Sequence, residues 1–334
     1  MNKIIALFSA LLVLASLLLF GCGVTNSSNN NNNSGGARAW SQLLSAGAFA
    51  ARDGFPLLAF NGQLWIIGGH SYSYGTSGTD VYWNDVWSSS DGITWTMQTS
   101  SANFSPRTLH TGLVFDNKMW ILGGSRDTSY DMLNEIWSSS DGITWTQVSA
   151  NPVFSGRYHH RAAVMDNKMW VSGGTGWLND VWYSSNGQSW TQAVTNASWP
   201  PRIGNGFISH ENKLWVINGY FGDGETWSSP DGASWTIVPS GNSALPRGSH
   251  FFGCVVFDNK MWVVGGNRQD RWGFVTDSNT SYYSANGSNW TESSATPSFT
   301  ARHRHGTAVL NNKLYVVGGG TTASGYLNDV WVLQ

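Results

Sequence analysis

Short apolar runs alternate with polar turn residues along most of the chain, from about residue 37 to the C-terminus. The runs are five to seven residues long and rich in β-branched and aromatic side chains, which is typical of strands. Asp-Gly, Asn-Gly and Asp-Asn pairs separate the runs and favour tight hairpin turns. No segment keeps a sustained helical period. The pattern therefore predicts an all-β protein.

A repeat with a period of 45 to 55 residues organises these runs. Six tryptophans mark one position of the repeat: Trp40, Trp95, Trp145, Trp190, Trp235 and Trp290. An arginine follows each of them by 12 residues: Arg52, Arg107, Arg157, Arg202, Arg247 and Arg302. Each copy then holds two apolar runs around a turn, a Gly-Gly pair in five of the six copies, and Asn-Asp-Val-Trp or a variant. Four strands per copy at this period predict a six-bladed β-propeller of four-stranded antiparallel blades.

The two ends of the repeat region complement each other. The sixth copy stops at Gln334, just after its third strand, and Trp40 stands where a fourth-strand tryptophan is expected. We therefore expect the N-terminal strand, within residues 37–45, to pair with the last blade and close the ring. Closure removes the open sheet edge that otherwise favours aggregation.

The motifs of the repeat resemble those of a known family. Arg-x-x-His, Trp-x-x-Gly-Gly and Asn-Asp-Val-Trp are similar to the kelch repeat, and this resemblance covers about nine-tenths of the chain. It implies a propeller like those of the galactose oxidase central domain and the sialic-acid mutarotases. Ser-x-Asp-Gly-x-x-Trp also resembles the Asp-box of sialidases, but it is one residue shorter between Asp and Gly. We interpret it as a structural turn.

The N-terminal segment has a different character. Lys3 precedes an apolar run over residues 4–20, which is typical of a secretory signal peptide. Leu-Phe-Gly-Cys at the end of this run resembles the bacterial lipobox. The resemblance implies a lipoprotein signal peptide over residues 1–21 and lipidation of Cys22. An ordinary signal peptide with an incidental cysteine is the alternative.

A polar tract separates this segment from the repeats. Residues 22–36 are rich in Asn, Ser and Gly, so we expect a flexible tether to a propeller over residues 37–334. Gly23 follows the cysteine, and a residue other than Asp there resembles lipoproteins sorted to the outer membrane where two membranes exist. We expect a protein of the bacterial cell envelope, lipid-anchored and outside the cytoplasm.

Composition excludes several classes of function. Charged residues make up 11% of the chain and the net charge is −2, so the basic excess of a nucleic-acid-binding protein is missing. Two cysteines cannot form a disulfide framework or a cysteine-rich metal site. Cys254 lies in an apolar run, which indicates a buried structural thiol. We expect no cofactor, no metal, no nucleic-acid partner and a monomer.

Strand order places the loops between second and third strands, and the connections between blades, at one end of the propeller, which we call the loop face. These loops vary in length: 70–83, 125–133, 175–178, 220–223, 267–278 and 320–327. Sixteen of the 20 tryptophans occupy repeated core positions, and the other four lie on the loop face. We expect a ligand to bind there through aromatic rings: Trp83, Trp177, Trp199, Trp272, Tyr74, Tyr130, Tyr158 and Phe221. Alternatively, these rings only pack the loops onto the rim.

The six repeated arginines are expected near the channel mouth. They form either an anion-binding ring for a carboxylate or phosphate, or a structural set bonded to the blades, and their recurrence favours the structural role. Acids within the repeat are expected to fix loop ends: Asp85, Glu135, Asp180, Glu225 and Asp329. Histidines three residues after four of the arginines are expected to pack rather than to catalyse: His110, His160, His250 and His305. Acids outside the repeat are candidate general acids or bases without identifiable partners: Asp53, Asp80, Asp127, Asp131, Asp223, Asp270 and Asp277.

Two functions remain open, because one fold can serve several. The first, which we favour, is a non-enzymatic recognition protein that binds a glycan or a protein partner through the loop face. The second is a sugar-active enzyme, because the architecture resembles sialic-acid mutarotases, which are epimerases. Arginines would then hold the sugar carboxylate, and a loop Asp or a channel His would move the proton. No catalytic set can be assigned to numbered residues.

Overall fold

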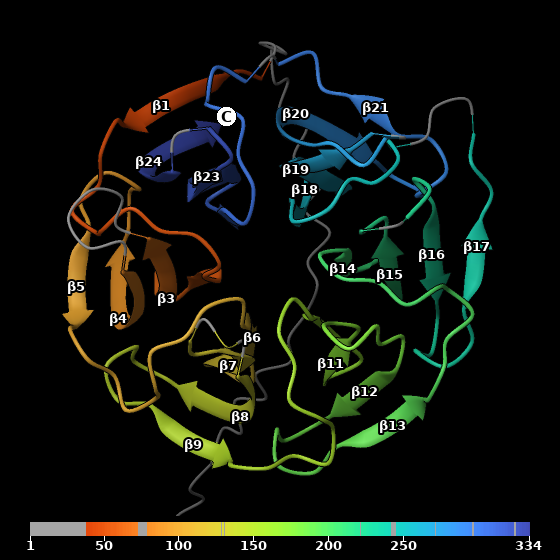
Figure 1. Cartoon of the computed structure of the whole chain (residues 1–334), viewed down its shortest axis with the longest axis horizontal. Coiled ribbons are helices and arrows are strands. Elements are labelled where there is room, and N and C mark those ends of the chain that lie inside the picture. The colour runs from red at the N-terminus through yellow and green to blue at the C-terminus, as the bar shows by residue number, and fades with distance from the viewer. Residues whose placement is uncertain are drawn as a thin grey trace, which may run out of the picture. The chain divides into compact units, whose positions relative to one another are not determined.

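The computed structural model describes residues 38–334, except 73–78, 128, 130, 221, 242–244, 271, 296 and 324. Six four-stranded antiparallel sheets stand around a central axis, as the face view in Figure 1 shows. The prediction of a six-bladed β-propeller is confirmed. Within the described part of the chain, no helix is long and apolar enough to cross a membrane.

Five blades are built from strands consecutive in sequence, from the channel outward. Blade 1 comprises β2 (Leu57–Phe60), β3 (Gln63–Tyr72), β4 (Asp80–Ser89) and β5 (Thr96–Thr99). Blade 2 comprises β6 (Thr111–Phe115), β7 (Lys118–Ser125), β8 (Met132–Ser139) and β9 (Thr146–Ser149). Blade 3 comprises β10 (Arg161–Met165), β11 (Lys168–Ser172), β12 (Val181–Ser184) and β13 (Thr191–Val194). Blade 4 comprises β14 (Gly206–His210), β15 (Lys213–Ile217), β16 (Thr226–Ser229) and β17 (Thr236–Val238), and blade 5 comprises β18 (Gly253–Phe257), β19 (Lys260–Gln269), β20 (Val275–Ser284) and β21 (Thr291–Glu292).

The sixth blade joins the two ends of the repeat region. It comprises β22 (Gly306–Leu310), β23 (Lys313–Thr321), β24 (Gly325–Leu333) and, as its outermost strand, β1 (Trp40–Leu44). β1 runs antiparallel to β24, with Trp40 opposite Leu333. The predicted closure by the N-terminal strand is therefore confirmed.

The hydrophobic core is divided among the six interfaces between neighbouring blades, each with its own cluster of buried side chains. Between blades 1 and 2, Trp65 is 5% exposed, and its indole N–H donates to the carbonyl of Phe60 at 3.0 Å. The turn of the next blade lies directly on this indole. Gly142 has φ of +74°, and a Cβ there would lie 2.0 Å from the Trp65 ring, so only glycine fits. Burial of such a ring contributes about 1.5–3 kcal/mol.

The Ser-x-Asp-Gly-x-x-Trp segments form the turns between third and fourth strands. In blade 2, the carboxylate of Asp141 accepts the backbone N–H groups of Ile143 and Thr144, both at 2.8 Å. Burial alone would raise the pKa of Asp141, but these hydrogen bonds lower it. The Asp side chain therefore supplies the acceptors of the turn, and the motif is structural here.

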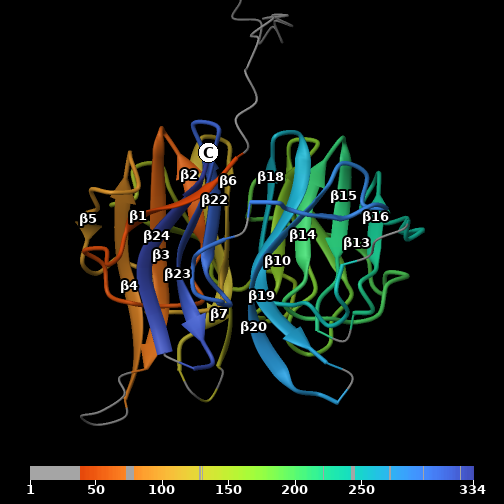
Figure 2. The same ribbon diagram turned by 90° about the horizontal axis from the view of Figure 1, so that it is seen from above.

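The loop face lies along the lower edge of the propeller in Figure 2. Its hairpins differ in reach because their strands differ in length. β3, β4, β19 and β20 have ten residues each, whereas β11, β12, β15 and β16 have four or five. The loop face is therefore uneven, with blades 1 and 5 projecting beyond blades 3 and 4.

Candidate functional site

Five of the six repeated arginines are buried and paired with an acid of the same blade. The pairs are Arg52–Asp85, Arg107–Glu135, Arg157–Asp180, Arg202–Glu225 and Arg302–Asp329. In blade 1, Nη1 of Arg52 also donates to the carbonyl of Gly68 at 3.0 Å. None of the five lines the cavity in the channel. Their donors are used inside the blades, so they fix each connection between blades onto the second and third strands instead of forming an anion-binding ring.

The sixth arginine does not occupy the equivalent place. The side chain of Arg247 is 75% exposed and pairs with exposed Asp223 at 2.6 Å. Ser249 occupies the buried position instead. Its carbonyl accepts the N–H of Gly219, and in the other blades the carbonyl of the repeated arginine accepts the equivalent bond. A two-residue insertion before β18 causes this shift. Thr280 stands where the other blades have the acid, so blade 5 lacks both members of the ion pair.

Three of the predicted packing histidines are buried, and each directly precedes the first strand of its blade: His110, His160 and His305. Burial, together with the charge of Arg107, lowers the pKa of His110 well below its usual value. A Cβ on Gly123 would lie 2.9 Å from His160, so the imidazole packs against the Gly-Gly backbone. These rings are neutral and structural. His250 is displaced by the insertion and bridges to Asn267 at the start of its blade.

Two of the predicted binding rings are exposed on the loop face. Trp177 is 51% and Trp272 is 73% exposed. Phe274, in the same hairpin as Trp272, is 71% exposed. The carboxylate of Asp270 accepts the backbone N–H groups of Trp272 and Phe274 at 2.8 and 2.9 Å. These two bonds fix the backbone that carries both rings.

Other predicted rings are covered by the fold. Trp199 is 1% exposed and packs edge-on against Trp235 at 6.0 Å, so it offers no surface to a ligand, which corrects the prediction. It stands three residues before an arginine, where four other blades have phenylalanine, and this offset in the sequence could have identified it as core. Trp83 and Tyr158 are half-buried, Trp83 over the Arg52 guanidinium. The remaining predicted residues lie outside the described residues: Tyr74, Tyr130, Phe221 and Cys22.

The connections between blades meet around the channel through their backbones. One residue of each connection has a positive φ, from +53° to +66°: Gly54, Leu109, His159, Gly204, Phe251 and Arg304. The N–H of each donates to the carbonyl of its counterpart in the preceding blade at 2.7–3.4 Å, and Gly54 closes the circle by donating to Arg304. We call these six residues the channel collar. Non-glycine residues rarely adopt this conformation, and they do so mostly where surrounding structure enforces it.

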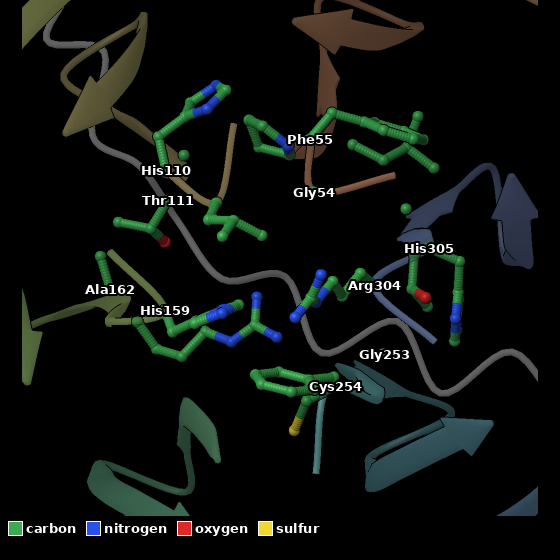
Figure 3. Close-up of a pocket in the computed structure, with 18 of the residues that line it drawn as sticks. Gly54, Phe55, His110, Thr111, His159, Ala162, Gly253, Cys254, Arg304 and His305 are labelled. Atoms are coloured by element: carbon green, nitrogen blue, oxygen red, sulfur yellow. The ribbon is translucent and has the colours of Figure 1, made fainter. Parts of the chain in front are cut away.

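A cavity of about 170 Å³ lies in the channel, lined by five of the six collar residues, all but Gly204, and by residues of the first strands. Arg304 and His159 come from opposite sides of the channel and point into it (Figure 3). Phe251 lies between them: its ring centroid is 4.7 Å from the Arg304 guanidinium and 4.4 Å from the His159 ring. Burial lowers the pKa of His159 well below its usual value, as do the charges of Arg304 and Arg161. His159 is therefore neutral.

Arg161, the first residue of β10, is a second cation of this cavity. Its Nε donates to the carbonyl of Asn205 at 3.3 Å. Burial lowers its pKa. No carboxylate of the described residues lies within ion-pair distance of it. The collar end of the channel therefore carries two positive charges, one of which has no acidic partner in this part of the chain.

Cys254 also lines the cavity. Burial raises the pKa of its thiol to about 12, which the charge of Arg161 only partly counteracts. A thiol with this pKa is not a nucleophile near neutral pH. Cys254 therefore lines the channel as an unreactive thiol.

A second cluster of polar side chains, centred on His70, lies between blades 6 and 1. Nε2 of His70 is 2.6 Å from Oδ1 of Asp80, and Nδ1 is 3.6 Å from Oδ1 of Asp53 and 3.3 Å from the hydroxyl of Tyr326. Oδ2 of Asp53 lies 3.6 Å from Nη1 of Arg304. Burial alone would lower the pKa of His70, but the two carboxylates raise it above its usual value. Sequence reasoning named both acids but not the histidine that joins them.

The neighbouring boundary, between blades 5 and 6, has a related contact. Asp277 of β20 accepts from Nδ1 of His303 at 2.7 Å, from Asn267 at 2.7 Å and from Thr322 of the β23–β24 hairpin. Burial alone would raise the pKa of Asp277, but His303 and Thr322 lower it. This carboxylate is fully used in joining the two blades. Among the described residues, no group of three or more His, Cys, Asp or Glu side chains could hold a metal ion.

Comparisons with known proteins agree with this architecture. A solved structure described as "Structure of YjhT" is similar, with a TM-score of 0.66 and 15% sequence identity, covering 87% of this chain and 96% of the other. No curated protein matches the chain. Residues 301–334 match the Kelch motif, and residues 54–266 match the KLHDC2/KLHL20/DRC7 Kelch-repeats domain. The second match spans more than half of the chain, and the protein therefore belongs to the kelch-repeat family.

Proposed function

We propose that this protein is a non-enzymatic recognition protein that binds a carboxylate-bearing glycan or protein at the loop face, with the carboxylate at the collar end of the channel. The observation that carries the proposal is the pair of cations, Arg161 and Arg304, that line one cavity. Arg161 has no acidic partner among the described residues, and Arg304 has only the distant Asp53. Both guanidiniums have donors left for a ligand.

The energetics support an anionic ligand. A partly buried cation without a counter-charge loses hydration that nothing in the protein restores. A carboxylate accepts two parallel hydrogen bonds from a guanidinium, and such bonds are about twice as strong as neutral ones. The neutral imidazole of His159 and the ring of Phe251 would form the less polar part of the same wall.

The loop face supplies a second kind of contact. Trp272 and Phe274 stand exposed on the β19–β20 hairpin, and Trp177 stacks on Tyr220 with ring centroids 6.4 Å apart. Exposed rings held by a fixed backbone bind sugar faces or apolar side chains at low entropic cost. We propose that the cavity selects the acid and that these rings bind the remainder of the ligand.

The location belongs to the same proposal. A lipid on Cys22 and a tether over residues 22–36 would hold the propeller at the surface of a bacterial membrane, outside the cytoplasm. A protein so placed meets envelope glycans and secreted proteins. Globomycin, which blocks lipoprotein signal cleavage, should leave a longer precursor in the producing cells. If globomycin left the length of the protein in the cells unchanged, this result would contradict lipidation.

A binding measurement tests the proposal. We expect the purified protein to bind acidic members of a glycan array, and free N-acetylneuraminic or glucuronic acid in calorimetry. Arg161→Gln and Arg304→Gln should each weaken binding by about tenfold or more, as loss of a charged hydrogen bond does. Arg38→Gln is the matched control, because its pair with Asp258 lies away from the cavity. Equal losses in all three variants would contradict the proposal, as would binding of neutral glycans only.

One observation favours a second candidate, a sugar mutarotase. Asp53 separates Arg304 from His70, which lies between Asp53 and Asp80 with Tyr326 in contact, and such a histidine can donate and accept protons. A mutarotase opens a sugar ring by moving a proton from the anomeric hydroxyl to the ring oxygen. Exchange NMR on N-acetylneuraminic acid distinguishes the candidates. Faster exchange between anomers that disappears in His70→Gln would favour the enzyme, and an unchanged rate would favour recognition alone.

A further inference from the structure

Asp53 stands between two basic groups of different blades. Its Oδ2 is 3.6 Å from Nη1 of Arg304 in the collar, and its Oδ1 is 3.6 Å from Nδ1 of His70 on β3. Both distances are longer than a hydrogen bond. Asp53 is 2% exposed, and its Oδ1 has no hydrogen-bond partner in the described part of the structure. One buried negative charge is therefore shared between the channel and the boundary of blades 6 and 1.

The groups that face His70 come from three neighbouring segments. Asp53 precedes β2, Asp80 and Tyr82 lie on β4, and Tyr326 lies on β24. The rings of Tyr82 and Tyr326 have centroids 4.8 and 5.5 Å from that of His70. Histidine is the side chain whose charge ordinarily changes around neutral pH, and His70 is the histidine of this set.

We propose that Asp53 couples the two sites, so that binding of an acidic ligand at Arg304 is accompanied by uptake of a proton at His70. This inference rests on the proposed function, because it describes how the same anion site is regulated. It makes Asp53 a positioning residue for the site, since it acts through Arg304 and does not touch the ligand.

Charge balance explains the coupling. When His70 is neutral, Arg304 is the nearest cation to Asp53, and an acidic ligand must compete with Asp53 for it. When His70 is protonated, it compensates Asp53, and the guanidinium of Arg304 is left to the ligand. The same coupling must act in reverse, because linkage is reciprocal: a bound acid draws Arg304 away from Asp53 and strengthens proton binding at His70. Affinity therefore rises as pH falls through the titration of His70.

The first test measures protons taken up on binding. N-acetylneuraminic acid and glucuronic acid are titrated into the protein in two buffers of different ionisation enthalpy, between pH 5 and pH 8. We expect uptake of a fraction of one proton and tightening by about fivefold towards low pH, a usual size for coupled sites. His70→Gln should abolish both effects. Asp277→Asn is the matched control, because this carboxylate pairs with the histidine of the neighbouring boundary and should leave both effects unchanged.

The second test needs no ligand. NMR titration of His70 should show a lower pKa in Asp53→Asn, which removes the shared charge, and a higher one in Arg304→Gln, which removes the competitor. Arg38→Gln should change nothing. An unchanged pKa in Arg304→Gln would overturn the coupling even if acids bind. Binding without proton uptake would also overturn it while leaving the proposed function intact, whereas failure of both acids to bind would count against the proposed function itself.

Discussion

Asp85 holds the guanidinium of Arg52 with both carboxylate oxygens, at 2.5 and 2.9 Å, inside the first blade. The arginine precedes the first strand and the aspartate lies on the third, so the pair ties the connection between blades to the middle of the sheet. Four other blades repeat this contact. Blade 5 lacks this buried ion pair, so its exposed arginine, Arg247, serves as an internal control for measuring how much the pair contributes to stability.

The buried ion pair predicts a large cost for removing one partner alone. Arg52→Met should lower the free energy of unfolding by about 3–5 kcal/mol, because Asp85 is left buried without a counter-charge. Urea denaturation measures the change. Arg247→Met is the control, since this exposed pair is worth about 1 kcal/mol or less. Equal effects of the two substitutions would contradict the structural role assigned to the buried arginines.

Closure of the ring predicts a strong dependence on Trp40. Its ring is 8% exposed and packs against Phe299 at 5.0 Å, next to the pairing of β1 with β24. Trp40→Ala should cost about 3–5 kcal/mol of unfolding free energy and expose the edge of β24 to other molecules. Thermal unfolding and light scattering measure both effects. The exposed Trp272→Ala should change stability by about 0.5 kcal/mol or less, and similar losses for both would argue against closure by β1.

His70 predicts a pH-dependent part of the stability. Its pKa in the folded protein is raised above the usual value of 6.5 by Asp53 and Asp80, although burial opposes this. The stabilisation is therefore fully present below pH 6.5, and it is lost as pH rises through the raised value of the folded state. The difference in unfolding free energy between wild type and His70→Asn should be larger at pH 5 than at pH 9. A constant difference over this range would rule out the assigned carboxylate contacts.

The high pKa of Cys254 predicts a protected thiol. With a value of about 12, it should react with iodoacetamide at pH 8 far more slowly than an exposed cysteine. Cys22→Ser protein, which keeps Cys254 as its single cysteine, allows mass spectrometry to follow the modification. Urea should restore the normal rate by unfolding the channel. Rapid modification of the folded protein would show that the inner strand is accessible.

The repeat made the fold predictable, and a break in the repeat limited the site. Closure could be predicted because the last copy stops at Gln334 after its third strand, and Trp40 at the other end matches the tryptophan of a fourth strand. In blade 5, counting 12 residues from Trp235 reached Arg247, although Ser249 occupies the structural position. An insertion of two residues fits on either side of the arginine, and spacing alone does not decide between them.

The polar residues of the channel and of the boundary between blades 6 and 1 were harder to predict from the sequence. Tyr326 and His70 are 256 residues apart and meet only because the ring closes. Arg161 and Arg304 are ordinary basic residues in the sequence, and their significance comes from the cavity they share. Asp53 and Asp80 stood out from the repeat, yet their partner lies on another strand. Such groupings depend on tertiary distance rather than on any local pattern.

The channel collar has a consequence for how this pore can diversify. Its six members are joined head to tail by main-chain hydrogen bonds, so the frame of the opening does not depend on which side chains it carries. Two members are glycine and four are unlike one another. Substitutions at these positions can therefore change which ligands enter the channel, while the backbone ring around the opening stays the same.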